Sequence, residues 1–353
     1  MKNVRKLLAL LICLTMAVAM VACSAPAAEE PVAEAPVAEA PVEEPAAEKT
    51  RIVIMPKLIG IDYYNAVEVG VKIAAEEMAD VAEIEWIGPT DGTAAAQIEM
   101  LTSIIATKPD VICVACNDTE ALVPTFQQAT AEGIKVVTWD SDSASGRDLF
   151  VDLVDYDVFG NALIDATAKQ IGEAGNVAII TTSFTATNQV NWIRVIEEKI
   201  ASTYPNIKII TTEAVGEDTQ AAYEKATALM NSNPDLAGFI VLGCPNVPGV
   251  AQAVSEAGKA GEIAVVGNGL PNSVREYIKS GVMEETEMWN ATYHGYLTLY
   301  AAQQLCTEGV AVGDTISAGS LGDFTVQEME DGTPIIAMNL LVVNADNVDE
   351  FDF

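Results

Sequence analysis

Residues 109–140 read PDVICVACNDTEALVPTFQQATAEGIKVVTWD, which predicts a strand, a helix and a second strand in one short stretch. The same order returns about 125 residues later, where residues 234–246 read PDLAGFIVLGCPN and residues 264–268 read AVVGN. A polar residue ends the second strand of each copy, Asp140 in the first and Asn268 in the second. Unless two βαβ units resemble each other by chance, this repetition predicts two lobes of similar topology.

The alternation of strands and helices extends from Arg51 through most of the chain. Strands are expected at residues 52–55, 82–87, 111–115, 135–138, 149–152, 177–181, 208–212, 238–242 and 263–266. Helices are expected at residues 65–78, 94–107, 120–132, 161–173, 188–204, 219–232, 248–258 and 273–279. Continuous apolar strands separated by helices indicate parallel sheets that are covered on both faces. Right-handed crossovers then give an α/β fold with two doubly wound parallel-sheet lobes.

Polar side chains follow the strands of both predicted lobes, and ligands of open parallel sheets bind at these carboxyl ends. The polar residues are Lys57, Asn117, Asp118, Asp140 and Asp142 in the first lobe, and Asn188, Gln189, Asn246 and Asn268 in the second. The aromatic residues near them are Tyr63, Tyr64, Trp139, Trp192 and Trp289. Neutral polyols need many hydrogen bonds and an apolar surface for their ring faces, so this mixture predicts a sugar site. For Trp139 and Trp192, ordinary core packing is the alternative.

Composition and motifs exclude several classes of function. The chain has 51 acidic and 18 basic residues and a net charge of -33, whereas nucleic-acid binding needs a basic surface. The single histidine, His294, belongs to no metalloprotease or catalytic-triad motif, and Gly267-Asn-Gly269 lacks the third glycine of a dinucleotide site. Cys113 and Cys116 are three residues apart on a strand and so point to opposite faces, which disfavours joint metal binding. We therefore expect no enzymatic activity, no cofactor and no metal ion.

The N-terminus predicts export and lipid anchoring. Residues 1–22 begin with basic residues and continue into an apolar run that is too short for a permanent membrane span. The run ends before Cys23 in a sequence that resembles a bacterial lipobox, so cleavage would leave Cys23 as a lipidated N-terminus. Ordinary secretion, with Cys23 incidental, is the alternative. Residues 23–50 are rich in Pro, Ala and Glu, which predicts a disordered spacer.

A series of motifs along nearly all of residues 52–350 resembles one known family. The motifs are IMPKLIG at 54–60 followed by Tyr63 and Tyr64, GPT at 88–90, NDTEALVP at 117–124, TWDSD at 138–142, TNQ at 187–189 followed by Trp192, GNGLP at 267–271, MWN at 288–290 and VNADN at 343–347. The series is similar to the type I periplasmic sugar-binding proteins of ABC importers, within them to the rhamnose-binding and autoinducer-2-binding group. The resemblance implies a monomer outside the cytoplasm that delivers a small sugar to an ABC permease and meets the membrane only through its lipid anchor.

The resemblance also implies three hinge crossings, near Asp155, Trp289 and Ser320. The first lobe would comprise residues 51–155 and 289–319, and the second lobe residues 156–288 and 320–353. The candidate ligand-binding residues are Lys57, Tyr63, Tyr64, Asn117, Asp140, Asp142, Asn188, Gln189, Trp192, Cys244, Asn268, Trp289 and Asn290. Lys57 and Asp140 would bind sugar oxygens, and one of the two tyrosines would stack on the ring. A ligand that contacts both lobes would stabilise the closed state.

The choice of ligand depends on a few positions. The residues that match autoinducer-2 receptors are Lys57, Asp140 and Gln189. The residues that depart from them are Asn188, Leu242 and Cys244, where those receptors have aspartate, proline and alanine. The TNQ and GLP stretches look more like the rhamnose-type proteins, so a rhamnose-like monosaccharide is the favoured ligand. Autoinducer-2 is one alternative, and a ligand-sensing receptor that feeds a signalling partner is another.

Overall fold

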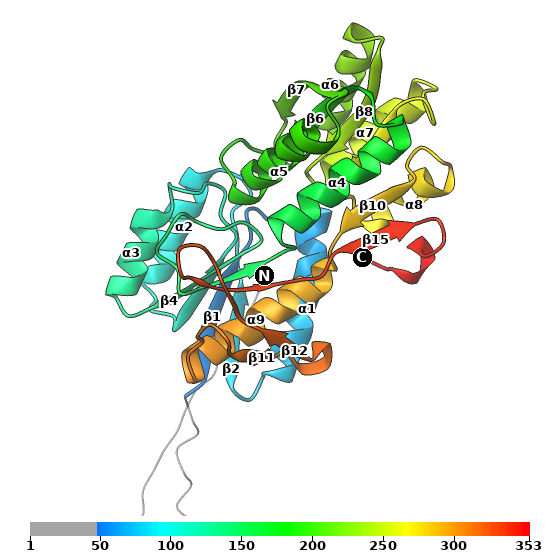
Figure 1. Ribbon diagram of the computed structural model, residues 1–353. Helices are drawn as coiled ribbons and strands as arrows, with labels where there is room; N and C mark the ends of the chain where they lie inside the picture. Colours follow the sequence, from blue (N-terminus) through cyan, green and yellow to red (C-terminus); the bar gives the residue numbers. More distant parts are fainter. Residues whose placement is uncertain (1–47) are drawn as a thin grey trace, which may run out of the picture. The chain divides into compact units, whose positions relative to one another are not determined.

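The structure of this chain, a computed structural model, describes residues 48–353 (Figure 1). These residues belong to one compact unit. The predicted signal sequence 1–22, Cys23 and nearly all of the predicted spacer 23–50 lie outside the described residues. The first strand begins at Thr50, so the folded part starts one residue earlier than predicted. Within the described part of the chain, no helix combines the length and the apolar character needed to cross a membrane.

Two sheets of mostly parallel strands form the framework. The larger sheet has the order β13-β14-β5-β4-β3-β1-β2, and all its pairings are parallel except that between β13 and β14. Its strands are β1 (Thr50–Met55), β2 (Ala82–Trp86), β3 (Val111–Val114), β4 (Lys135–Trp139), β5 (Leu149–Asp152), β13 (Gln327–Glu328) and β14 (Pro334–Ala337). The smaller sheet is parallel, with the order β7-β6-β8-β9. Its strands are β6 (Gly175–Thr181), β7 (Ile207–Ala214), β8 (Leu236–Val241) and β9 (Ala264–Gly267). The predicted α/β fold with parallel sheets is confirmed.

Helices cover both faces of each sheet, so successive residues of the central strands are all buried. On β1, Ile52 and Ile54 belong to one apolar cluster and Val53 and Met55 to another. The helices are α1 (Asp62–Glu77), α2 (Ala94–Ile105), α3 (Val123–Ala131), α4 (Tyr156–Ile171), α5 (Thr187–Thr203), α6 (Thr219–Ser232), α7 (Asn246–Glu256), α8 (Pro271–Lys279) and α9 (Ala291–Thr307), with short 3-10 turns η1 (Gly319–Leu321) and η2 (Val348–Glu350). Near-continuous apolar strands of this kind are typical of parallel sheets between two helical layers.

The C-terminal segment departs from the predicted division of the chain. Residues 320–353 were expected in the second lobe, but β14 pairs in parallel with β5 of the larger sheet, Ile335 opposite Phe150. The apolar run of β14 adds to the free edge of β5 and buries Ile336, which explains the difference. The chain then continues to β15 (Leu341–Asn344), which pairs antiparallel with β10 (Glu285–Met288) (Figure 1). A short hairpin of β11 (Thr315–Ser317) and β12 (Asp323–Thr325) comes just before β13 in the chain.

Helices α1 and α9 lie side by side against the larger sheet and approach very closely (Figure 1). Two glycines permit the contact: a Cβ atom on Gly70 would lie 1.8 Å from the backbone oxygen of Thr292, and one on Gly295 would lie 2.4 Å from the backbone oxygen of Val67. The hydroxyl of Thr292 donates to the backbone oxygen of Ala66 at 3.1 Å across the same contact. Any side chain at Gly70 must therefore push the two helices apart.

We expect Gly70→Ala to lower the free energy of unfolding by about 3 kcal/mol, at the upper end of the usual cost of overpacking. Urea denaturation measures this change. Gly92→Ala is the matched control, because its Cβ would meet its nearest neighbour, Leu58, at an ordinary 3.6 Å. A Gly70→Ala protein as stable as the Gly92→Ala protein would contradict the close packing of α1 and α9.

Candidate functional site

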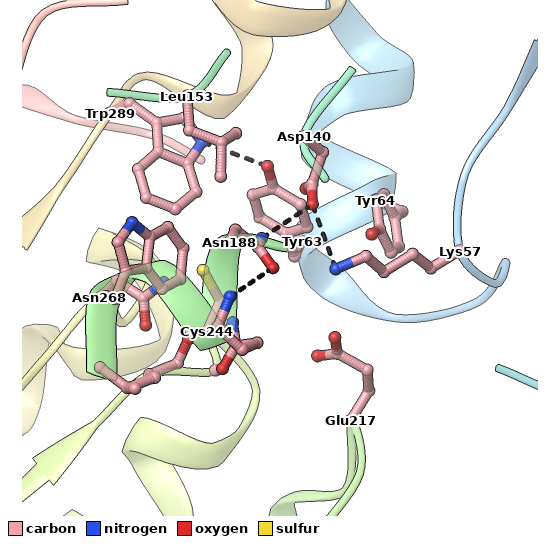
Figure 2. Close-up of a pocket in the computed structure, with 14 residues that line it drawn as sticks. Lys57, Tyr63, Tyr64, Asp140, Leu153, Asn188, Glu217, Cys244, Asn268 and Trp289 are labelled. Carbon is pink, nitrogen blue, oxygen red and sulfur yellow. Dashed lines mark hydrogen bonds and ion pairs between the residues drawn. The ribbon is translucent and has the colours of Figure 1, made fainter. Parts of the chain in front are cut away.

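A pocket lies where loops at the carboxyl ends of the larger sheet meet those of the smaller sheet (Figure 2). A water-sized sphere can occupy only about 20 Å³ of it, which is room for about one water molecule. A sugar must therefore widen the pocket as it binds. Its lining residues are Lys57, Tyr63, Tyr64, Asp140, Leu153, Asn188, Gln189, Trp192, Glu217, Leu242, Gly243, Cys244, Asn268 and Trp289.

An ion pair from the larger sheet stands at the centre of the pocket. The Lys57 Nζ atom lies 3.4 Å from Asp140 Oδ1, and each residue is only 3% exposed. Lys57 follows β1, and Asp140 follows β4 with a backbone φ of 63°, a left-handed conformation that aspartate tolerates better than most residues. Because both charges are removed from water, each depends on the other and on hydrogen bonds for stabilisation.

The smaller sheet contributes an amide pair at the start of α5. The Asn188 side-chain nitrogen donates to Asp140 Oδ1 at 3.3 Å, so the two sides of the pocket are in direct contact. Gln189 donates to the backbone oxygen of Leu242 at 3.1 Å and accepts from the Thr181 hydroxyl at 2.7 Å. These bonds fix the Gln189 side chain, whereas the Asn188 oxygen accepts from the backbone nitrogen of Gln189 at 2.8 Å and its nitrogen faces the ion pair.

Two buried polar atoms on the wall of the pocket have no hydrogen-bond partner in the described structure: Asn268 Oδ1 and Trp192 Nε1. Both residues are almost completely buried. Buried polar groups normally have partners, and those that lack one call for an explanation. A ligand that carries hydroxyl groups would supply the missing partners, because a hydroxyl can donate to Asn268 and accept from Trp192.

Aromatic rings form the apolar part of the wall. Trp289 Nε1 donates to the Tyr63 hydroxyl at 3.1 Å, and the ring centroids of Tyr63 and Tyr64 are 4.9 Å apart. The rings of Trp192 and Trp289 are 6.0 Å apart. Burial is the main cause and the charge of Asp140 the next cause that raises the pKa of each tyrosine well above the usual value. Both hydroxyls therefore stay protonated. Such rings offer flat apolar surface together with hydroxyl donors.

The structure brings ten of the predicted site residues together and leaves three outside the pocket. The three are Asn117, Asp142 and Asn290. The Asn117 side chain donates to the backbone oxygen of Lys57 at 2.9 Å and so supports the lysine loop. Asp142 pairs with Arg147 at 2.8 Å, away from the pocket lining. Asn290 is the N-cap of α9, where its side chain accepts from the backbone nitrogen of Tyr293 at 3.0 Å.

Four lining residues were not predicted from the sequence as ligand contacts: Leu153, Glu217, Leu242 and Gly243. Glu217 is the most important of them because it is ionisable. It follows the carboxyl end of β7, so the rule that selected Asp140 could also have selected Glu217. Removal from water raises the pKa of Glu217 to about 7, although Lys57 opposes the shift.

His294, Trp139 and the two cysteines of β3 and its loop lie outside the pocket lining. Burial lowers the pKa of His294, whose Nε2 lies 3.0 Å from the backbone oxygen of Val151. Trp139 is fully buried in the core, which is the alternative that the sequence left open for it. Cys116 packs in the apolar layer on the opposite face of the larger sheet from Cys113. Within residues 48–353, no cluster of three or more His, Cys, Asp or Glu side chains could hold a metal ion.

The two parallel sheets with a pocket at their strand ends define a binding protein of the α/β class. The sequence profile of the periplasmic binding protein domain matches residues 52–309, so the chain belongs to that family. It is a substrate-binding protein of the sugar ABC transporter class and not an enzyme, and its family acts outside the cytoplasm.

Named relatives are similar along most of the chain. The D-ribose/D-allose-binding protein of Pseudomonas aeruginosa is 28% identical over 241 residues, which cover 66% of this chain and 75% of the relative. A solved sugar ABC transporter structure from Actinomyces odontolyticus is 31% identical, with a TM-score of 0.69 over 86% of this chain and 98% of that one. A solute-binding protein from Clostridium phytofermentas with bound L-rhamnose is 24% identical, with a TM-score of 0.81 over 86% of this chain and 98% of that one.

Proposed function

We propose that this protein captures a small neutral sugar, with a rhamnose-like monosaccharide favoured, and delivers it to an ABC permease. The observation that carries the proposal is the composition of the pocket between the two sheets. A buried ion pair, Lys57 and Asp140, and the unpartnered polar atoms of Asn268 and Trp192 stand beside aromatic rings. Sugars match this arrangement because they carry hydroxyl groups around an apolar ring face.

Delivery to a permease requires that the bound state differ from the free state. We infer that the two sheets belong to two lobes joined near Asp155, near Trp289 and, in place of the crossing expected near Ser320, between β14 and β15, and that a sugar bridges them. Asp140 from the larger sheet and Asn188 from the smaller sheet already lie 3.3 Å apart, so one small ligand can reach both sides. A ligand that contacts both lobes stabilises only the arrangement in which they are close.

Autoinducer-2 is the second candidate ligand. Lys57, Asp140 and Gln189, the residues shared with autoinducer-2 receptors, all line the pocket. Asn188, Leu242 and Cys244, where the chain departs from those receptors, line the same pocket. Because the departures are in the lining itself, they favour a different ligand. A role as a sensing receptor would use the same pocket with a signalling partner.

The part of the proposal that concerns the N-terminus rests on sequence. We propose that Cys23 is lipidated and that residues 23–50 act as a spacer between the membrane surface and the folded part. An acidic, proline-rich segment stays extended, so it would let a monomeric binding domain meet its permease without entering the bilayer.

A panel of ligands tests the proposed function. We expect at least one of L-rhamnose, D-ribose, D-allose and autoinducer-2 to raise the melting temperature, and we expect L-rhamnose to raise it most. At a ligand concentration of 100 times Kd, binding adds about 2.7 kcal/mol of stability. For the roughly 300 folded residues this corresponds to a rise of about 4 °C. Differential scanning fluorimetry measures the shift, and calorimetry gives Kd. If none of these ligands shifts the melting temperature, the proposed function is wrong.

A further inference from the structure

The backbone around Glu217 is held in place at the wall of the pocket. The buried Asn246 side chain donates to the backbone oxygens on both sides of Glu217, to Gly216 at 3.0 Å and to Asp218 at 3.1 Å. Asp218 in turn caps α6, since its side chain accepts from the backbone nitrogens of Gln220 and Ala221. The position of Glu217 is therefore fixed before any ligand binds.

The carboxylate of Glu217 points into the pocket, toward Lys57 (Figure 2). Together with Tyr63 and Cys244, Glu217 also lines a second cavity of about 230 Å³. Glu217, which is partly exposed, therefore lies between the two spaces.

The charges of the pocket leave Glu217 without a cationic partner. Among the lining residues there are two carboxylates, Asp140 and Glu217, and one ammonium group, that of Lys57. Lys57 pairs with Asp140, whereas Glu217 forms no ion pair within 4.0 Å in the described structure. The unpartnered Asn268 oxygen in the same pocket is a second acceptor. A carboxylate without a cationic partner and an unpartnered amide oxygen favour a ligand with hydroxyl donors and disfavour an anionic one.

We propose that Glu217 is a specificity-determining residue: its carboxylate accepts a hydrogen bond from a hydroxyl of a neutral sugar and repels sugar acids. The inference deepens the proposed function and rests on it. A hydrogen bond to an ionised acceptor is stronger than one to a neutral group, so the ionised form of Glu217 binds the hydroxyl better. Discrimination against anionic sugars follows from the same charge.

The ionisation of Glu217 makes sugar affinity depend on pH. Burial raises the pKa of Glu217 to about 7, and the facing charges act in opposite senses: Lys57 lowers that pKa and Asp140 raises it. The other titratable groups around it, Tyr63, Tyr64 and Cys244, have pKa values raised well above their usual ranges. These groups stay protonated between pH 6 and 8, while Glu217 loses its proton. Affinity for a neutral sugar therefore rises from pH 6 to pH 8.

The test compares Glu217→Gln with wild type in calorimetric titrations of L-rhamnose, D-ribose and D-allose at pH 6, 7 and 8. We expect the wild-type protein to bind its sugar about tenfold more tightly at pH 8 than at pH 6. Glu217→Gln should bind with the weaker affinity at every pH. Glu213→Gln is the matched control, because Glu213 lies on β7, pairs with Lys225 at 2.9 Å and lies outside the pocket lining. It should behave as wild type.

Four results would overturn the inference or the proposed function on which it rests. Equal affinities of wild type and Glu217→Gln at pH 8, or an unchanged pH dependence in the variant, would remove Glu217 from recognition while leaving sugar binding intact. Tighter binding of D-galacturonate than of D-galactose by wild type would contradict the repulsion. If wild type binds none of the sugars at any pH, the proposed function fails and the inference fails with it. Glu217→Ala gives a second reading should the glutamine variant fold poorly.

Discussion

Replacing Asp140 by asparagine should reduce sugar affinity at least 100-fold and abolish the ligand-induced rise in melting temperature. Asp140 is buried, contacts Lys57 at 3.4 Å and faces Asn188 at 3.3 Å. Hydrogen bonds to a charged group contribute about 1.5–3 kcal/mol each, so the loss of two such bonds to the ligand exceeds a factor of 100. Calorimetry measures the affinity, and fluorimetry measures the thermal shift.

The choice of asparagine keeps the backbone unchanged. Asp140 has a φ of 63°, a conformation that asparagine adopts readily, whereas alanine would add strain to the loss of charge. Asp142→Asn is the matched control. Asp142 lies two residues away and is equally buried, but it pairs with Arg147 outside the pocket lining. Its ligand contacts are unaltered, so it should bind sugar within about threefold of wild type, which is a change of less than about 1 kcal/mol in binding free energy. Full binding by Asp140→Asn would remove Asp140 from the site.

Replacing Lys57 by methionine should lower the free energy of unfolding by about 3–5 kcal/mol. The change leaves the buried Asp140 carboxylate without its cation, and removing one partner of a buried ion pair carries a cost of this size. The double variant Lys57→Met, Asp140→Asn should recover part of the loss, because neither charge is then left alone. Urea denaturation of the two single variants and the double variant measures the coupling energy, which should exceed 1 kcal/mol.

Lys135→Met is the control for that cycle. Lys135 pairs with Asp148 at 3.2 Å on the same sheet, but its side chain is 48% exposed. Exposed pairs contribute about 0–1 kcal/mol, so this variant should remain close to wild type in stability. Equal destabilisation by Lys57→Met and Lys135→Met would show that the pocket pair has no special role in the folded state.

The strand-end rule explains why so much of the pocket could be predicted from sequence. Lys57, Asp140 and Asn268 each follow a buried apolar strand, and parallel strands bring such positions to one edge. The rule applies equally to Glu217, but Ile207 is the one fully buried residue of β7, so this strand lacks the continuous apolar run that marks a buried strand. Which side chain turns inward after a strand ends depends on loop contacts. Asp142 turns to Arg147, for example, and that contact has no local signal.

The C-terminal segment shows a different limit. The four residues of β14 form an apolar run that could add to an edge of either sheet, and in the structure it pairs with β5. A long-range choice of this kind depends on the assembled fold and not on the segment itself. The position of the final residues also depends on a long-range contact. Arg275 of α8 donates to the backbone oxygen of Phe351 at 2.6 Å.

A crystal structure of the protein grown with L-rhamnose tests the central claim most directly. The account predicts one sugar between the two sheets, with hydroxyl oxygens within about 3 Å of Asp140, Asn188 and Asn268, the normal range for such hydrogen bonds. A sugar bound elsewhere on the protein, or a pocket that stays closed by its own side chains at saturating sugar, would contradict it.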